Sequence, residues 1–263
     1  MIDFFLKLSP VIQALIAGFF TFFVTALGSS IVYLFKGINR TFLDGMLGFS
    51  AGVMIAASFF SLLNPAIILC EKIKMIPWLM VGIGFLFGGL LLFIGDKIFT
   101  KLLKKRGNSK IKRSLMLVIS ITIHNIPEGL AVGVAFGSVK YHIDGATIIA
   151  ACILTLGIAL QNFPEGSAVS LPLKREGFNT RKAFIIGSLS AIVEPMSSVI
   201  GALIVLKVRF LLPFLLAFAA GAMIYVVIEE IIPESQTNKS KDLMALFSIM
   251  GFLLMMILDV ALG

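Results

Sequence analysis

Eight long apolar stretches, separated by short polar connections, occupy almost the whole chain. They lie at about residues 11–35, 43–69, 77–100, 114–138, 145–171, 183–206, 210–232 and 242–262. A helix needs roughly 20 apolar residues to cross a bilayer, and in lipid only helices and closed barrels satisfy their own backbone polar groups. We therefore predict an all-α integral membrane protein with eight transmembrane helices, in which residues 1–263 form a single transmembrane domain.

The composition excludes a water-soluble fold. Hydrophobic residues make up 59% of the chain and charged residues 14%, whereas a soluble domain has about 25% charged residues. The formal net charge is +8, but the basic residues lie in short connections between apolar stretches. In that position they indicate membrane orientation and contacts with anionic lipid, so we expect no nucleic-acid partner.

The distribution of Lys and Arg predicts that both termini lie outside. In that orientation the outer side keeps only Lys7, Lys72, Lys74, Lys140, Lys207 and Arg209 of the 22 basic residues. The others, including the basic loop at about 100–113, would face the cytoplasm, as the positive-inside rule requires. A short chain with few long loops suggests a multi-pass protein of the cell membrane, specifically a prokaryotic inner membrane.

Three acidic residues fall near the middle of predicted spans: Glu128, Glu165 and Glu194. An ionised side chain at the bilayer centre costs at least ~2.5–3.5 kcal/mol, and no Lys or Arg is expected at the same depth. A bound cation would supply the missing positive charge. The sequence therefore predicts a cation site at mid-membrane.

Two of these glutamates belong to a near-repeat in consecutive, antiparallel spans. The segments are His124-Asn125-Ile126-Pro127-Glu128-Gly129 and Gln161-Asn162-Phe163-Pro164-Glu165-Gly166. In each, the first residue and the glutamate are four apart and so share a helix face. The proline favours a hinge, and the glycine permits close helix packing. Kinked helices held by Asn and Gln hydrogen bonds are the alternative, but such packing does not require glutamate.

The nature of the predicted cation follows from the available ligands. Oxygen ligands alone suit magnesium or calcium, whereas the imidazole of His124 favours zinc, iron, cobalt or nickel. His142, in a short outer connection, is interpreted as an ordinary loop residue. Met54 lies at mid-depth in the second span and is either a thioether ligand or core filling.

Polar residues toward the membrane surfaces suggest a pathway. Ser61 and Asn64 follow Met54 toward the outer side and would line an entrance, with interhelical hydrogen bonding as the alternative. Glu229, Glu230 and Glu234 gather at the inner end of the seventh span. They would receive released metal or form an interfacial acidic patch. Asp96 and Asp259 are expected to be interfacial.

At these motifs the chain resembles the ZIP (Zrt/Irt-like) metal transporters, in particular the bacterial branch that includes GufA. The resemblance covers the whole chain and implies zinc uptake into the cytoplasm, with iron, manganese, cobalt or cadmium as other transported ions. It also implies a homodimer and no cofactor other than the transported metal. The implied metal ligands are His124, Asn125, Glu128, Gln161, Asn162, Glu165 and Glu194, with Met54 similar to a methionine ligand of the bacterial branch. Many relatives have histidine in place of Gln161, and some have an acid in place of Asn162.

Two rival functions remain open from the residues. An intramembrane zinc hydrolase would need three strong protein ligands and an activated water, but the sequence has no HExxH motif, so we expect no enzyme. A proton-coupled carrier of a small organic cation would use the same glutamates with flanking aromatic residues. The single tryptophan, Trp78, lies near a predicted helix end, which argues against that carrier.

Overall fold

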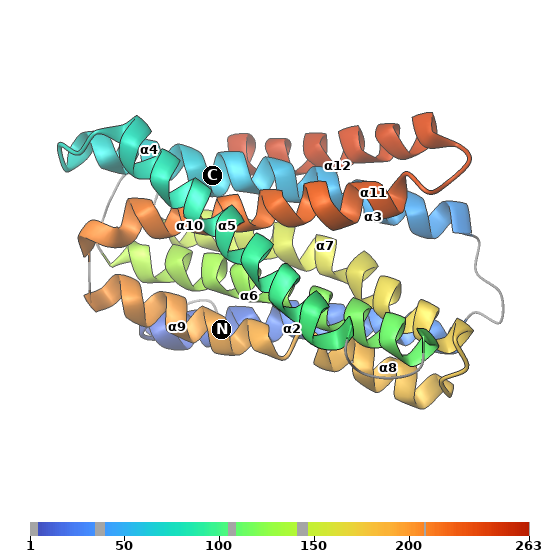
Figure 1. Cartoon of the computed structure of the whole chain (residues 1–263). Helices are drawn as coiled ribbons and strands as arrows, with labels where there is room; N and C mark the ends of the chain where they lie inside the picture. The colour runs from blue at the N-terminus through green and yellow to red at the C-terminus, as the bar shows by residue number, and fades with distance from the viewer. Residues whose placement is uncertain (1–4, 35–39, 105–108, 141–146, 208, 263) are drawn as a thin grey trace.

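The computed structural model describes residues 5–34, 40–104, 109–140, 147–207 and 209–262, which form helices and turns without any strand. Some of the predicted features lie outside the described part: residues 105–108 of the basic loop, His142, and the side chains of Asp96 and His124. The helices run side by side along one axis, with α5 crossing the bundle obliquely (Figure 1). The all-α fold predicted from the apolar stretches is confirmed.

The helices follow the predicted spans closely. In chain order they are α2 (Pro10–Leu34), α3 (Arg40–Ala57), α4 (Asn64–Lys72), α5 (Pro77–Lys104), α6 (Ser109–Val139), α7 (Ile148–Arg175), α8 (Thr180–Leu189), α9 (Val193–Lys207), α10 (Leu212–Val226), α11 (Ile232–Ser235) and α12 (Lys241–Leu262). Two π-helical segments, η1 (Ser58–Leu63) and η3 (Val227–Ile231), join α3 to α4 and α10 to α11. A short 3₁₀ turn, η2 (Arg209–Leu211), precedes α10.

Seven segments of the described residues are long and apolar enough to cross a membrane. They correspond to the predicted spans other than the fourth. Helix α6 occupies that fourth position and has 31 residues, but several side chains in its first half are not described. A multi-pass membrane protein is therefore confirmed, whereas the count of eight spans stays a prediction.

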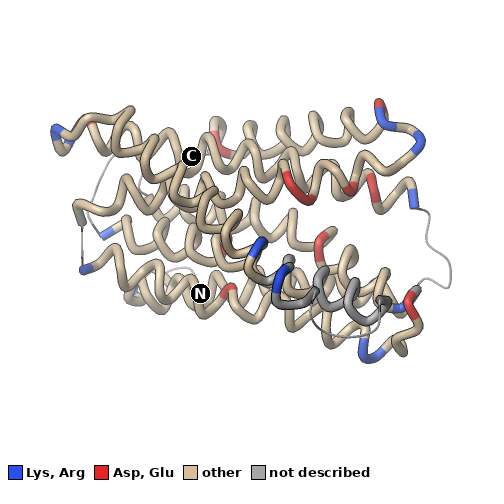
Figure 2. Tube along the Cα trace, in the orientation of Figure 1, with Lys and Arg blue, Asp and Glu red and all other residues tan. Residues whose placement is uncertain are grey.

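The helices pack as two sets that meet along one interface. Helices α2, α6, α7, α8 and α9 contact one another, while α3 packs on α12 and α5 on α10. Across the interface, α3 and α12 contact α7, and α10 contacts α6. In Figure 2 the basic residues concentrate at the ends of the bundle, and acidic residues also lie along its length. The described interior therefore contains acidic positions, and it also contains buried neutral polar side chains such as Ser50, Gln161 and Asn162.

The irregular backbone lies elsewhere than the motif prolines suggest. Helices α6 and α7 run without interruption through Pro127 and Pro164. The predicted sixth span, 183–206, is instead broken at residues 190–192, between α8 and α9. The predicted span is present as Thr180–Lys207, but its helix is interrupted, because tight turns such as Ile192 N–H to Leu189 C=O, 3.1 Å, replace the helical bonds just before Glu194.

Candidate metal centre

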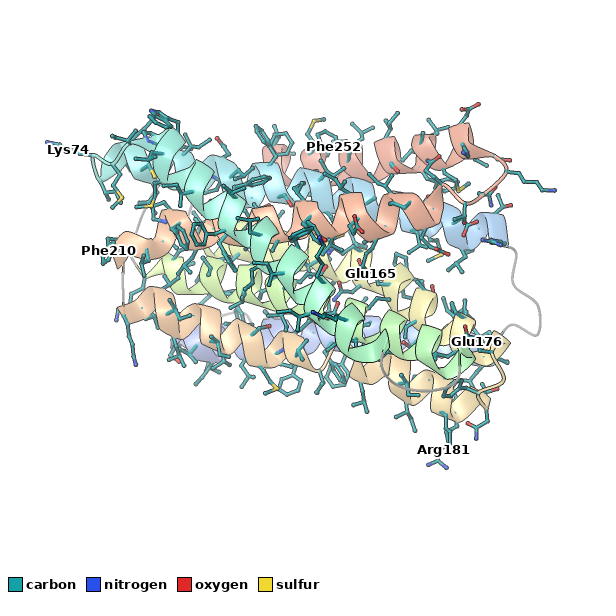
Figure 3. The ribbon with its side chains drawn as sticks, viewed as in Figure 1. Lys74, Glu165, Glu176, Arg181, Phe210 and Phe252 are labelled. Atoms are coloured by element: carbon teal, nitrogen blue, oxygen red, sulfur yellow. The ribbon has the colours of Figure 1, made fainter. Side chains whose placement is uncertain are left out.

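The three glutamates predicted at mid-membrane are buried on three different helices. Glu128 on α6 and Glu194 on α9 are 0% exposed, and Glu165 on α7 is 4% exposed. Figure 3 shows Glu165 inside the bundle, between the end marked by Lys74 and Phe210 and the end marked by Glu176 and Arg181. Carboxylates without solvent need another source of polar contacts or of positive charge.

Each carboxylate accepts a hydrogen bond from a neutral side chain of another helix. The Gln161 amide on α7 donates to Glu128 Oε1. The Asn162 amide donates to both Glu194 oxygens, each at 2.9 Å. Neutral donors orient a carboxylate but supply no positive charge, which a bound cation would provide.

The same two amides present unused acceptors. Within the described part of the chain, Gln161 Oε1 and Asn162 Oδ1 are buried and have no hydrogen-bond partner. An unsatisfied buried carbonyl oxygen costs about 1–3 kcal/mol, and such atoms in a native structure call for an explanation such as an ion or water. Amide and carboxylate oxygens together form a donor set that suits a divalent cation.

The break between α8 and α9 shapes the surroundings of Glu194. Glu194 lies in the first turn of α9, where the partial positive charge of a helix N-terminus stabilises a carboxylate. Pro195 follows it, at a position that needs no helical N–H partner. Asn125 of α6 donates to the Ser190 carbonyl in the break at 3.0 Å. The Asn125 amide therefore holds the turn that presents Glu194.

The motif glycines bring these helices close together, as the sequence predicts. A Cβ added at Gly129 would overlap the Glu194 carbonyl oxygen, and one at Gly166 would overlap the Thr25 carbonyl oxygen. Gly129 thus sets α6 directly against α9, and Gly166 sets α7 against α2. The glutamate that precedes each glycine is carried into the same interior region.

Sequence reasoning missed the hydroxyl groups around the glutamates. The Ser50 hydroxyl on α3 donates to Glu165 Oε1 at 3.0 Å, and the Thr25 hydroxyl on α2 donates to Glu194 Oε1 at 3.5 Å. Thr21, Thr25 and Ser29 are all buried and spaced four apart on α2. The four-residue spacing of these hydroxyl residues in the first span is visible in the sequence, and it indicates a polar helix face that charged residues alone do not reveal.

Of the two remaining predicted ligands, the structure describes the side chain of only one. Met54 is 0% exposed on α3, and the His124 side chain lies outside the described residues. Among the described side chains, no three His, Cys, Asp or Glu residues gather closely enough to hold one ion. Each glutamate is instead hydrogen-bonded to an amide or hydroxyl partner. The centre as described is a mixed carboxylate and amide site.

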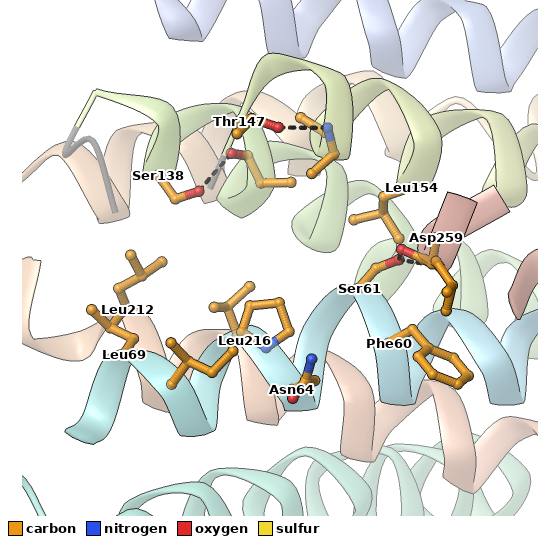
Figure 4. A pocket seen from close by; sticks show the side chains of 16 residues that line it. Phe60, Ser61, Asn64, Leu69, Ser138, Thr147, Leu154, Leu212, Leu216 and Asp259 are labelled. Carbon is orange, nitrogen blue, oxygen red and sulfur yellow. Dashed lines mark hydrogen bonds between the residues drawn. The ribbon is translucent and has the colours of Figure 1, made fainter. Parts of the chain in front are cut away.

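A cavity lies on the predicted entrance route. It has a volume of about 260 Å³ and is lined by residues that include Ser61, Asn64, Ser138, Thr147 and Asp259 (Figure 4). The Ser61 hydroxyl donates to Asp259 at 2.8 and 2.9 Å. Asp259, expected to be merely interfacial, thus lines a cavity together with Ser61. Of the predicted release residues, Glu229 and Glu234 are exposed and Glu230 is half-buried, in η3 and α11.

Comparison with known proteins gives one consistent family. A family model described as ZIP zinc transporter matches residues 11–114 and 106–259. The chain is 39% identical to the zinc transporter ZIP11 of Bos taurus, with 97% of this chain and 98% of that protein covered. It is 34% identical to the zinc transporter ZIPB of Bordetella bronchiseptica, covering 95% and 81%. It is 33% identical to the zinc transporter GufA of Myxococcus xanthus, covering 95% and 98%.

Proposed function

Because the chain belongs to the ZIP zinc transporter family, it is a membrane transporter of zinc and not an enzyme, and we propose that it carries the ion inward. Zinc would pass into the cytoplasm through a site at mid-membrane. Helices α6, α7 and α9 would form that site, with α3 as a fourth wall. Iron, manganese, cobalt or cadmium would be secondary substrates. Family membership also removes the two rival functions, the hydrolase and the carrier of organic cations.

One observation carries the location of the site: three buried glutamates from α6, α7 and α9 accept hydrogen bonds from neutral side chains, beside amide oxygens that have no described partner. The metal ligands would be drawn from His124, Asn125, Glu128, Gln161, Asn162, Glu165 and Glu194, with Met54 as a thioether ligand. Ligands of moderate strength suit a carrier, because an ion bound too tightly would not leave.

The route would begin at the cavity that contains Ser61 and Asn64 and end at Glu229, Glu230 and Glu234. With the route in this direction, the α4–α5 and α9–α10 connections would lie outside, and the α7–α8 and α11–α12 connections would lie inside. It agrees with the excess of Lys and Arg on the predicted cytoplasmic side. Both termini would then be outside, with eight spans in one domain. The working unit would be a homodimer surrounded by membrane lipid.

The experiment is zinc uptake into proteoliposomes. Wild type is compared with Glu128→Gln and Glu165→Gln, and Glu71→Gln serves as the matched control because Glu71 is exposed at the end of α4. The proposal requires saturable uptake by wild type and Glu71→Gln, with at least about a tenfold loss in both other variants. Full uptake by Glu128→Gln and Glu165→Gln would place the ion elsewhere. Sided measurement, with zinc outside or preloaded, tests the direction.

A further inference from the structure

Ser50 of α3 and Glu165 of α7 meet where the two helix sets touch. The Ser50 hydroxyl donates a hydrogen bond of 3.0 Å to Glu165 Oε1, and the residues are 0% and 4% exposed. A partner of this kind behind a metal-binding carboxylate fixes the direction in which the carboxylate points. We propose that Ser50 is a positioning residue of the metal site, which holds Glu165 toward α3. This inference rests on the proposed function.

Helix α3 gives Ser50 a rigid support. A Cβ added at Gly48 would lie 2.8 Å from the Met244 carbonyl oxygen, and one at Gly52 would overlap the Ser248 carbonyl oxygen. These glycines fix one face of α3 against α12. Residues two apart on a helix point about 200° apart, so Ser50 lies on the face opposite to Gly48 and Gly52. The Ser50 hydroxyl therefore projects from a helix whose opposite face is packed tightly against α12.

Helix α7 fixes the acceptor in the same way. Gly166, next to Glu165, leaves no room for a Cβ against the Thr25 carbonyl oxygen of α2. The Ser29 hydroxyl of α2 donates to the Gly166 carbonyl at 3.0 Å. Since α3 is held on the face opposite to Ser50 and α7 is held at the residue next to Glu165, the bond from Ser50 to Glu165 sets the direction of the carboxylate. A group fixed in this way loses little conformational entropy when it receives an ion.

Met54 extends the same face of α3. It lies four residues after Ser50, on the same helix face, and is 0% exposed. Ser50 therefore directs Glu165 toward the face of α3 that also carries the Met54 thioether. A carboxylate next to a sulfur ligand favours zinc and cadmium over manganese and other hard cations. Ser50 thus influences both the affinity of the site and its ranking of metals.

The test compares Ser50→Ala with Ser170→Ala in the full-length protein. Ser170 is a buried serine of α7 whose hydroxyl has no described partner, so its substitution makes the same chemical change away from the glutamates. Zinc uptake is measured in proteoliposomes over a range of zinc concentrations, per amount of folded protein. Ser50→Cys is the second variant, because it retains the side-chain size and introduces a thiol beside Glu165.

We expect the zinc KM of Ser50→Ala to rise about tenfold, with a smaller change in kcat, and Ser170→Ala to match wild type. Ser50→Cys should lower the KM for cadmium relative to that for zinc. A structural role would instead reduce the yield of folded protein and leave its KM unchanged. Equal KM values for Ser50→Ala and Ser170→Ala, with normal wild-type uptake, would overturn the role of Ser50 alone. Absence of wild-type uptake would overturn the proposed function itself.

Discussion

The Asn162 amide of α7 donates to both carboxylate oxygens of Glu194 on α9, each at 2.9 Å. Glu194 lies just after the break between α8 and α9, and this pair joins α9 to α7. An amide at position 162 can donate a hydrogen bond, whereas an ionised carboxylate at that position could not. The Asn162–Glu194 pair therefore stabilises the buried Glu194 carboxylate through hydrogen bonds from a neutral amide.

Asn162→Asp should make the protein less stable without zinc and more strongly stabilised by zinc. The substitution places two carboxylates side by side, so we expect the metal-free protein to lose about 1–3 kcal/mol of stability. Zinc should restore more stability than it does in wild type, because the new carboxylate is a ligand. Thermal unfolding with and without zinc measures both effects. Asn238→Asp is the control, since Asn238 donates to Asp44 Oδ2 at 2.8 Å; it should destabilise without an enhanced response to zinc. An unchanged zinc response in Asn162→Asp would contradict this interpretation.

Gly166→Ala should disrupt the contact between α7 and α2. Its Cβ would overlap the Thr25 carbonyl oxygen, and over-packing of this kind costs about 1–3 kcal/mol. Because Gly166 adjoins Glu165, zinc affinity should also fall. Gly82→Ala is the matched control on α5, where an added Cβ meets nothing within 4 Å. Melting temperature and equilibrium zinc binding test the pair, and equal stability of the two variants would show that close packing at Gly166 is unimportant.

Asp259→Asn should weaken the capture of zinc at the entrance. The substitution retains an acceptor for the Ser61 hydroxyl but removes the negative charge from the cavity. Attraction of a divalent ion by an exposed or partly exposed charge falls as salt increases. We therefore expect a few-fold higher zinc KM at low ionic strength, and a smaller difference from wild type at high ionic strength. Asp242→Asn, at the exposed opposite end of α12, should behave as wild type; a salt-independent effect of Asp259→Asn would argue against an electrostatic role.

The sequence was sufficient to predict the helical class, the approximate spans and the burial of Glu128, Glu165 and Glu194. Apolar length determines what can cross a membrane, and unpaired intramembrane acids are too costly to be incidental. It did not predict the break before Glu194, because residues 190–192 are as apolar as a helical span. Hydropathy does not report backbone geometry.

Partners of the glutamates were also beyond sequence reasoning. Ser50 and Thr25 carry no charge and are separated from their acceptors, Glu165 and Glu194, by more than 100 positions. Only the packing of α3 on α7 and of α2 on α9 brings them together. Asp44 was likewise missed, although it is 2% exposed and pairs with Arg40 at 3.6 Å. Its position near a predicted span end indicated an interfacial residue.

Locating zinc in the protein is the most direct test of whether the ion binds at the buried glutamates. Crystals of the zinc-loaded protein, measured on both sides of the zinc absorption edge, give an anomalous difference map that identifies the ion. We expect a peak between α6, α7 and α9, within ligand distance of Glu128 and Glu165, which disappears in Glu128→Gln and Glu165→Gln. A peak that persists in these variants, or zinc found only near Asp259 or Glu229, would contradict a carrier site built on the buried glutamates.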